Sequence, residues 1–191
     1  MSKNKLIITE FISLDGVMEA PGGEPGYKHA GWVGAYFSDE LGAYKGEEQL
    51  SKDVLLLGRK TYEGFYGAWP SRAGDPMADK INSMRKVVAS TTLGSSPWEN
   101  TEVVASGFAD HVASLKDSAD GDLLVAGSRT LAHSLLAVPG LVDEINLQVF
   151  PVILGSGARF YPDTEEPLKL DLVSSQQFPN GVLAQTYAPQ S

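Results

Sequence analysis

The segment that decides the fold is Leu57-Gly58-Arg59-Lys60-Thr61-Tyr62-Glu63. It continues an apolar run that starts at Val54, and the residues after Gly58 can turn helical. We therefore expect a buried strand that breaks at a glycine, with two cations and a hydroxyl at the break. Backbone N–H groups, a guanidinium and an ammonium that converge on one strand end suit a phosphate. The segment predicts a bound nucleotide cofactor; the alternative is a pair of solvated cations after a strand.

A second turn of this kind is Gly127-Ser128-Arg129-Thr130-Leu131, which follows an expected strand over residues 122–126 that is apolar from Leu123 onward. Ser128 and Thr130 either cap the helix that follows or bind a pyrophosphate at its N-terminus. The two turns reinforce each other, because the carboxyl ends of parallel strands share one edge of a sheet, where ligands collect. The chain has no GxxxxGK[ST] motif and no GxGxxG after its first strand, which argues against a P-loop or Rossmann site.

Two other strand ends carry polar residues. Asp15-Gly16 ends the first strand, and this pair either makes a turn or places Asp15 beside a ligand. Ser90-Thr91-Thr92 follows another strand, and its hydroxyls either bind a ribose or phosphate or satisfy backbone groups in a turn. Gly155-Ser156-Gly157 is interpreted as a flexible turn.

The order of apolar runs indicates an α/β fold in a single domain over residues 1–191. The expected strands are residues 5–13, 53–57, 86–89, 102–105, 122–126, 143–152, 170–178 and 182–187. The expected helices are residues 39–51, 61–65, 77–84, 108–117 and 130–137, with Ser38 as a cap for the first of them. Alternating strands and helices favour a mostly parallel sheet covered on both faces, and Asn180-Gly181 predicts an antiparallel hairpin at the end. The long stretch 14–36 is rich in glycine and proline and predicts a functional loop.

Composition excludes several classes of function. The chain has 191 residues, 42% of them hydrophobic, and a formal net charge of −9, which argues against a nucleic-acid-binding protein. It has no cysteine, which excludes disulfides and thiolate catalysis, and its three histidines are scattered, so we expect no metal site. The apolar run near the start is too short for a signal peptide or membrane span, so we expect a cytoplasmic protein with no membrane partner.

In these residues the chain resembles the dihydrofolate reductase-like superfamily. It is most similar to stand-alone relatives of the C-terminal reductase domain of the bifunctional riboflavin-biosynthesis deaminase-reductase. The resemblance rests on ordered segments, namely residues 11–16, 57–63, 88–90, 124–128, 143–145 and 151–157. It implies a three-layer α/β/α fold that binds NADP(H) across the carboxyl edge of the sheet, and it implies a homodimer.

The resemblance also implies roles for individual residues. The segment Leu57-Gly58-Arg59-Lys60-Thr61 would hold the 2′-phosphate and pyrophosphate, and Ser90-Thr91 would lie along the adenosine ribose. Gly127-Ser128-Arg129-Thr130-Leu131 would wrap the pyrophosphate and the nicotinamide side. Asp15 would lie beside the nicotinamide.

The chain departs from the family at two substrate positions. The helix acid of dihydrofolate reductases corresponds to a position near Gly42, with Asp39 about one turn earlier. The glutamate that riboflavin-pathway reductases carry before the second glycine turn is replaced here by Val125 and Ala126. The substrate therefore stays open, whereas the cofactor prediction does not depend on these positions.

The leading hypothesis is an NADPH-dependent reductase that transfers hydride to a small heterocyclic or carbonyl substrate. This activity would be similar to 5-amino-6-(5-phosphoribosylamino)uracil reductase of riboflavin biosynthesis. The proton would come from water or from a catalytic carboxyl, with Asp15 first and Asp39 second, and residues 17–36 would cover the substrate. The alternatives are dihydrofolate reductase activity or a non-catalytic NADP(H)-binding protein with the same fold.

Overall fold

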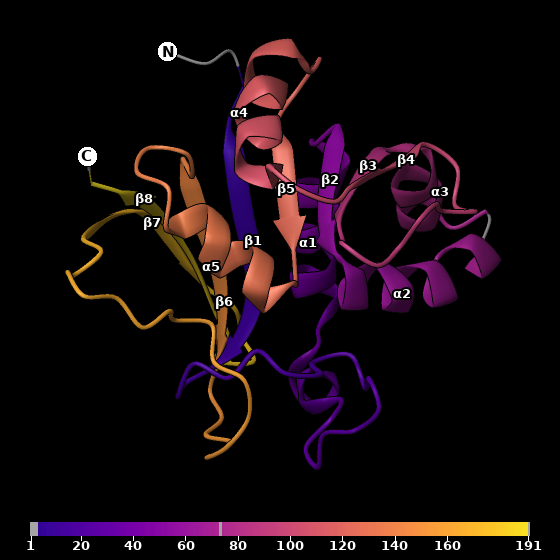
Figure 1. Ribbon diagram of the computed structural model, residues 1–191. Helices are drawn as coiled ribbons and strands as arrows, with labels where there is room; N and C mark the ends of the chain where they lie inside the picture. The colour runs from indigo at the N-terminus through magenta and orange to yellow at the C-terminus, as the bar shows by residue number, and fades with distance from the viewer. Residues whose placement is uncertain (1–3, 73, 191) are drawn as a thin grey trace.

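An eight-stranded sheet forms the centre of the molecule, with strand order β4-β3-β2-β5-β1-β6-β8-β7 (Figure 1). The computed structural model describes residues 4–72 and 74–190. The strands are β1 (Leu6–Ser13), β2 (Val54–Gly58), β3 (Arg85–Ala89), β4 (Thr101–Val104), β5 (Leu123–Ala126), β6 (Glu144–Phe150), β7 (Leu170–Gln177) and β8 (Leu183–Pro189). Pairing is parallel from β4 across to β6, and β8 and β7 are added antiparallel. This confirms the mostly parallel sheet with a C-terminal hairpin.

Helices cover both faces of this sheet, which confirms the three-layer α/β/α arrangement. They are α1 (Asp39–Leu50), α2 (Arg59–Ala68), α3 (Pro76–Ser83), α4 (Phe108–Ser118) and α5 (Arg129–Leu136), with 3₁₀ turns η1 (Trp32–Tyr36) and η2 (Pro70–Arg72). Apolar side chains of α4 and α5 join one cluster with one face of the sheet, and those of α1, α2 and α3 join two clusters on the other face. In Figure 1, α4 and α5 lie in front of the sheet.

Local sequence explains where several elements begin and end. The Ser38 hydroxyl accepts a hydrogen bond from the Leu41 N–H and caps α1, as expected from the sequence. Strand β6 ends at Phe150, two residues earlier than predicted, because Pro151 has no N–H to continue the ladder. In the hairpin, Gly181 adopts φ 86°, a conformation that costs glycine little, and its N–H donates to the Phe178 carbonyl at 3.0 Å.

The largest error in the predicted elements concerns the helix after Gly58. The sequence predicts a short helix over residues 61–65, but α2 runs from Arg59 to Ala68. Gly58 is its N-cap, and Arg59 and Lys60 are good helix formers that occupy its first turn. Arg59 and Lys60 therefore belong to the first turn of α2, which fixes the position of their backbone.

The predicted loop 14–36 is folded against the sheet, and it lies below the carboxyl ends of β1 and β5 in Figure 1. Trp32 packs edge-on against Phe150 of β6 with ring centroids 5.3 Å apart, and its indole N–H donates to the Glu19 carbonyl at 2.9 Å. The Tyr27 hydroxyl donates to the Ser156 carbonyl at 2.5 Å. The loop is thus anchored at several points.

Candidate functional site

The connections of β2 and β5 place a crevice at the centre of the carboxyl edge. These strands are neighbours, but the chain leaves β2 through α2 towards β3 and leaves β5 through α5 towards β6, on the opposite side. The helices also pack on opposite faces of the sheet. Such a reversal of direction leaves a gap between the two connections, and in open α/β sheets ligands bind there. Both glycine turns selected from the sequence lie at this point.

The two turns are in direct contact. The Ser128 hydroxyl accepts a hydrogen bond from the Gly58 N–H at 2.7 Å and donates to the Thr61 hydroxyl at 2.8 Å. Glycine is needed on both sides of this contact. A Cβ on Gly58 would lie 3.2 Å from the Ser128 side chain, and one on Gly127 would lie 3.1 Å from the Thr61 methyl group. The β2 and β5 turns therefore form one unit.

Ser128 has an unusual backbone conformation, and its side chain does not cap α5. It adopts φ 70° and ψ 60°, in the left-handed region that costs a non-glycine residue energy. Neither α2 nor α5 has a side-chain cap at its N-terminus. Of the two sequence interpretations of Ser128, capping by its hydroxyl is therefore wrong. The first-turn N–H groups of both helices remain available to an anion, whose charge the helix dipoles favour.

Arg59 bridges α2 and the loop after β3. Its Nε donates to Glu63 Oε1 at 2.8 Å, and its Nη1 donates to the Thr92 hydroxyl. The guanidinium is about half exposed, and the Lys60 side chain is also exposed. Two cations thus stand at the first turn of α2, beside the glycine unit.

The three hydroxyl residues after β3 have different surroundings. The Ser90 hydroxyl accepts hydrogen bonds from the Thr92 and Leu93 N–H groups at 3.3 and 3.0 Å, so it satisfies the backbone of a turn. Thr91 is exposed, and Thr92 is the residue that contacts Arg59. The family resemblance assigns Ser90 and Thr91 to the ribose, whereas Thr92 was expected only as part of the hydroxyl run. The run of three hydroxyl residues was the signal, but it does not show which one faces α2.

The remaining predicted cofactor residues differ in exposure. Leu57 and Leu131 are buried in the apolar clusters of the two faces, so their side chains fix the turns and do not face the crevice. Arg129 and Thr130 are exposed at the start of α5. The Arg129 Nε donates to the Arg159 carbonyl at 2.8 Å.

The Asp15 carboxylate holds a turn together. It accepts hydrogen bonds from the Ser13 hydroxyl at 2.7 Å and from the N–H groups of Leu154 and Gly155 at 3.1 and 2.9 Å. Burial raises the pKa of Asp15, but these hydrogen bonds outweigh burial and hold the pKa below its ordinary value. Asp15 is thus ionised at neutral pH, which argues against the proton-donor role predicted for it.

Gly155-Ser156-Gly157 lies against the turn that ends β1. The Asp15 carboxylate accepts a hydrogen bond from the Gly155 N–H. Gly157 adopts φ 121°, and a Cβ there would lie 2.7 Å from a Val17 methyl group, so close approach requires glycine at this position. Gly155 has open space around it, and its φ of 77° is what favours glycine there.

Asp39, the second predicted acid, is the first residue of α1 and is exposed. Among the described residues it makes no hydrogen bond or ion pair with either glycine turn. Gly42, at the position of the family's helix acid, lies against the ring of Phe37, which a Cβ would approach to 3.2 Å. The structure thus does not bring Asp15 and Asp39 together at the glycine turns.

Sequence reasoning missed a buried polar layer between α1 and the sheet. The Lys45 ammonium donates to the Thr9 hydroxyl at 2.6 Å, to Gln148 Oε1 at 3.2 Å and to the Glu48 carboxylate. Glu48 also accepts from Thr9 and from Asn146, both at 2.8 Å. Thr9-Glu10 inside an otherwise apolar strand and Gln148 inside another were the available signals.

Glu10 lies on the other face of β1, among apolar side chains. It is 5% exposed, and its Oε1 has no hydrogen-bond partner in residues 4–72 and 74–190. Burial raises the pKa of Glu10 well above its ordinary value; Lys45 lowers it and Glu48 raises it further.

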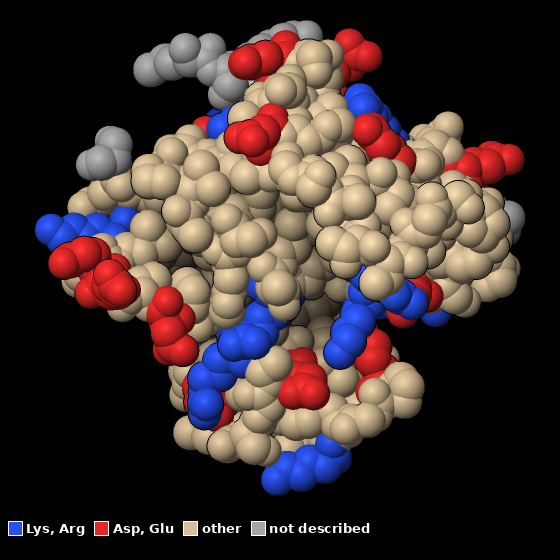
Figure 2. Space-filling view, in the orientation of Figure 1, with Lys and Arg blue, Asp and Glu red and all other residues tan. Residues whose placement is uncertain are grey.

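The surface of the molecule is hollowed next to α2 and α5. Figure 2 shows a hollow between the body that carries α2 and α5 and the segment below it, with Lys and Arg side chains on both sides. Within the described residues there is no cluster of three metal-ligating side chains and no helix long and apolar enough to cross a membrane.

Comparison with known proteins identifies the family. The family model for the RibD C-terminal domain matches residues 4–184. The chain belongs to this family. Two Bacillus subtilis proteins, YyaP and YwjB, are each 25% identical to it; the alignments cover 98% and 94% of this chain and 96% and 95% of those proteins. Neither has a described function in its name.

Solved structures share the fold. A putative riboflavin biosynthesis protein from Shewanella sp. PV-4 superposes with a TM-score of 0.76 at 20% identity, over all of both chains. A pyrimidine reductase-like protein from Corynebacterium diphtheriae gives 0.67 at 12% identity over 100% of this chain and 93% of that one. Dihydrofolate reductase from Enterococcus faecalis, complexed with NADP(H), gives 0.63 at 15% identity over 98% and 97%. The chain therefore has the fold of RibD-like and dihydrofolate reductase-like proteins.

Proposed function

We propose that this protein is an NADPH-dependent reductase of a small heterocyclic or carbonyl compound. The observation that carries the proposal is the contact between the β2 and β5 turns, where two helices begin without side-chain caps. Their free N–H groups suit a pyrophosphate, and Arg59 and Lys60 beside them suit a 2′-phosphate. When bound, NADPH would supply a hydride to an electron-poor C=N or C=O carbon.

The protein itself would contribute to the reaction mainly by positioning the cofactor and the substrate. The Ser128 hydroxyl fixes the distance between the two turns, so the phosphate-binding groups are organised before a ligand arrives. Residues 17–36 would cover the substrate and exclude water. Because Asp15 is held ionised by its hydrogen bonds, we assign the proton to water, with exposed Asp39 as the remaining carboxyl candidate.

Cofactor choice tests the role of Arg59. Replacing Arg59 with Ala removes a charge-assisted contact to the 2′-phosphate, so affinity for NADPH should fall roughly tenfold or more while that for NADH barely changes. The matched control is Arg72→Ala, in η2 beyond the C-terminal end of α2, where the guanidinium lies over the Trp69 ring. Isothermal titration calorimetry measures the affinities of the wild type and both variants for NADPH and NADH. Equal losses for both cofactors would remove Arg59 from this role.

A non-catalytic NADP(H)-binding protein is the second candidate. It is favoured by the absence of a carboxyl at Gly42 and by the commitment of Asp15 to the 154–155 turn. A turnover screen separates the candidates: NADPH oxidation is followed at 340 nm with pterins, the riboflavin-pathway ribosylaminopyrimidinone and small carbonyls. Binding without turnover on any class supports the second candidate, and turnover of dihydrofolate would support dihydrofolate reductase activity instead.

We also propose that the protein is a cytoplasmic homodimer that pairs through β7. This strand is the outer edge of the sheet, and nearly all of it is exposed, including the large side chains of Leu172 and Val173. An edge strand with an unpaired side and exposed apolar side chains favours pairing with another chain. Light scattering after gel filtration measures the mass, and a monomer at every concentration would refute this interface.

A further inference from the structure

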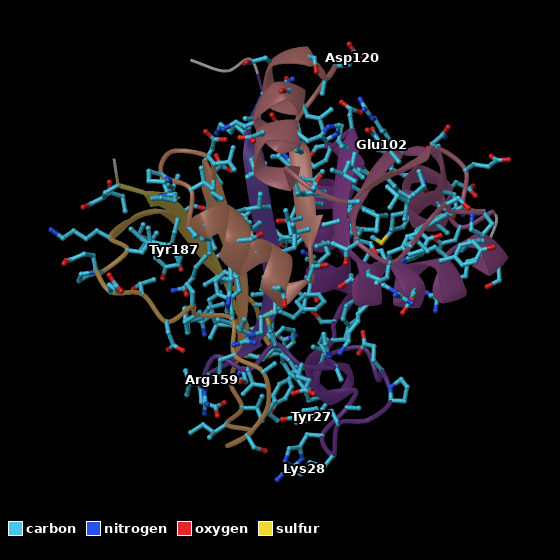
Figure 3. All side chains as sticks on the ribbon, viewed as in Figure 1. Tyr27, Lys28, Glu102, Asp120, Arg159 and Tyr187 are labelled. Carbon is cyan, nitrogen blue, oxygen red and sulfur yellow. The ribbon has the colours of Figure 1, made fainter. Side chains whose placement is uncertain are left out.

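A lysine is completely buried on the side of the sheet that carries Arg59. Lys86 is the second residue of β3, which lies next to β2, and its exposed fraction is 0%. Figure 3 marks this side of the sheet by Glu102 of β4, which pairs with Arg85 at the start of β3. A lysine is almost never fully buried unless its charge has partners. The contacts of the Lys86 ammonium therefore show which segments it holds together.

The Lys86 ammonium binds the C-terminal end of α3. It donates hydrogen bonds to the carbonyls of Ile81, Asn82 and Met84 at 3.2, 2.8 and 2.8 Å, so each of its three N–H donors has an acceptor. The last carbonyls of a helix lack partners within the helix, and a cation is favoured beside them. Burial lowers the pKa of Lys86 to about 8, although Glu99 raises it, so the ammonium form predominates at pH 7.

The same ammonium lies over the ring of Trp98, in the 90–100 loop between β3 and β4. Its nitrogen is 4.5 Å from the ring centroid, which makes a cation–π contact, and Trp98 is 5% exposed, so little water competes. The Trp98 indole N–H donates to Asn82 Oδ1 at 3.0 Å. The end of the loop is therefore attached to α3 through Lys86 and Asn82 together.

This loop also contacts α2 at two points. The Ser96 hydroxyl is hydrogen-bonded to the Tyr62 hydroxyl of α2 at 2.6 Å, and it accepts a hydrogen bond from the Trp98 backbone N–H at 3.0 Å. Nearer the start of the loop, the Thr92 hydroxyl accepts a hydrogen bond from Arg59 Nη1. The loop therefore connects the end of α3 to the guanidinium at the start of α2.

We propose that Lys86 is a positioning residue, which fixes the 90–100 loop against α3 and thereby places Thr92 against Arg59. The guanidinium is then oriented before a ligand arrives, which lowers the entropy cost of binding. This inference rests on the proposed function, because Arg59 is assigned there to the 2′-phosphate. Lys86 was expected only as the first residue of a strand over residues 86–89, because its burial depends on where α3 and the loop pack.

Hydrogen exchange tests the position of the loop without any ligand. Lys86→Met removes the ammonium and keeps a long side chain, so the backbone N–H groups of residues 90–100 should exchange at least about tenfold faster at pH 7. Trp98→Phe tests the same connection from the loop. The matched control is Lys116→Met on the opposite face of the sheet, because Lys116 is also buried and donates to the Leu141 carbonyl at 2.8 Å. Wild-type exchange of the loop in Lys86→Met, or equally faster exchange in the control, would overturn the inference.

Cofactor affinities test the consequence for Arg59. Lys86→Met should weaken NADPH binding at least about threefold and leave NADH binding unchanged, because only NADPH carries the 2′-phosphate. Thr92→Ala removes the contact itself, so adding Lys86→Met to it should cause no further loss. Calorimetry at pH 7 measures these affinities, and Lys116→Met should bind both cofactors as the wild type does. Unchanged NADPH binding in Lys86→Met, equal losses for both cofactors, or additive losses in the double variant would overturn the inference.

The failure of this inference can be told from the failure of the proposed function. Circular dichroism and thermal unfolding establish that each variant is folded, and Trp98→Phe replaces Lys86→Met in both experiments if Lys86→Met does not fold. If the wild-type protein binds no NADPH, the proposed function fails, and hydrogen exchange alone decides the inference. Faster exchange of residues 90–100 in Lys86→Met but not in Lys116→Met then supports it, and any other pattern overturns it.

Discussion

Ionisable side chains are buried on both faces of β1, but their hydrogen-bond partners differ. On the α1 face, Thr9 belongs to a layer in which Lys45 and Glu48 are both largely buried, paired and hydrogen-bonded to neighbours. On the α5 face, the next residue, Glu10, is buried without a partner for Oε1 in the described chain. Glu48 of α1, which Thr9 contacts, accepts hydrogen bonds from three donors, whereas burial raises the pKa of the neighbouring strand residue Glu10 well above its ordinary value. The two faces therefore differ in the partners that they offer a buried acid.

Removing one partner of the Lys45–Glu48 ion pair should have the largest effect on the free energy of unfolding. Replacing Lys45 with Met leaves the Glu48 carboxylate buried without its cation, so the free energy of unfolding should fall by about 3–5 kcal/mol. Urea denaturation at pH 7 measures it. The double variant Lys45→Met with Glu48→Leu removes both charges and should recover most of the loss. A loss in the double variant as large as in the single one would show that packing, and not the unpaired charge, is responsible.

The contribution of Glu10 to the free energy of unfolding should depend on pH. Unfolded Glu10 ionises near its ordinary pKa of 4.5, but folded Glu10 keeps its proton to higher pH. The stabilisation is complete below the unfolded pKa and is lost as pH rises towards the folded pKa, at about 1.4 kcal/mol per pH unit.

Glu10→Gln keeps the size and removes this titration. Its free energy of unfolding should fall less steeply than that of the wild type as pH rises above 4.5, by up to about 1.4 kcal/mol per unit while folded Glu10 keeps its proton. Urea denaturation across that range measures the difference. Parallel curves for the two proteins would mean that Glu10 is ionised in the fold.

An exposed ion pair near the other ends of the same strands gives the smallest effect. Lys5, just before β1, pairs with Glu144 at the start of β6, and the Lys5 side chain is 57% exposed. Glu144→Gln should change the free energy of unfolding by about 0–1 kcal/mol, and less in high salt. Urea denaturation with and without 1 M salt measures it. A loss approaching that of Lys45→Met would mean that burial does not separate these pairs.

Residues that act within their own segment could be predicted from the sequence. Gly58 and Gly127 were found because a glycine after a buried strand and before a helix has a local pattern. Ser38 was found as a cap for the same reason. The order of strands and the hairpin followed from alternation and from Asn180-Gly181.

Contacts between distant segments could not be predicted. The Ser128 hydroxyl bonds Gly58 across seventy positions, and no local signal distinguishes this from capping. The sequence does not distinguish Thr91 from Thr92, because the position of α2 decides which of them contacts Arg59. Glu10 was overlooked because the apolar residues around it predict a strand whichever face it occupies, and its isolation depends on what α5 and β6 bring to that face.

The Ser128 hydroxyl has one hydrogen, and its direction is set: it points to Thr61, while the lone pair receives the Gly58 N–H. The starts of α2 and α5 are therefore clamped to each other by a single oxygen atom. We propose that the motion that admits a ligand comes instead from the 14–36 loop, which lies below the carboxyl ends of β1 and β5. We expect ligand exchange to follow the opening rate of that loop, with the two helix starts keeping their spacing throughout.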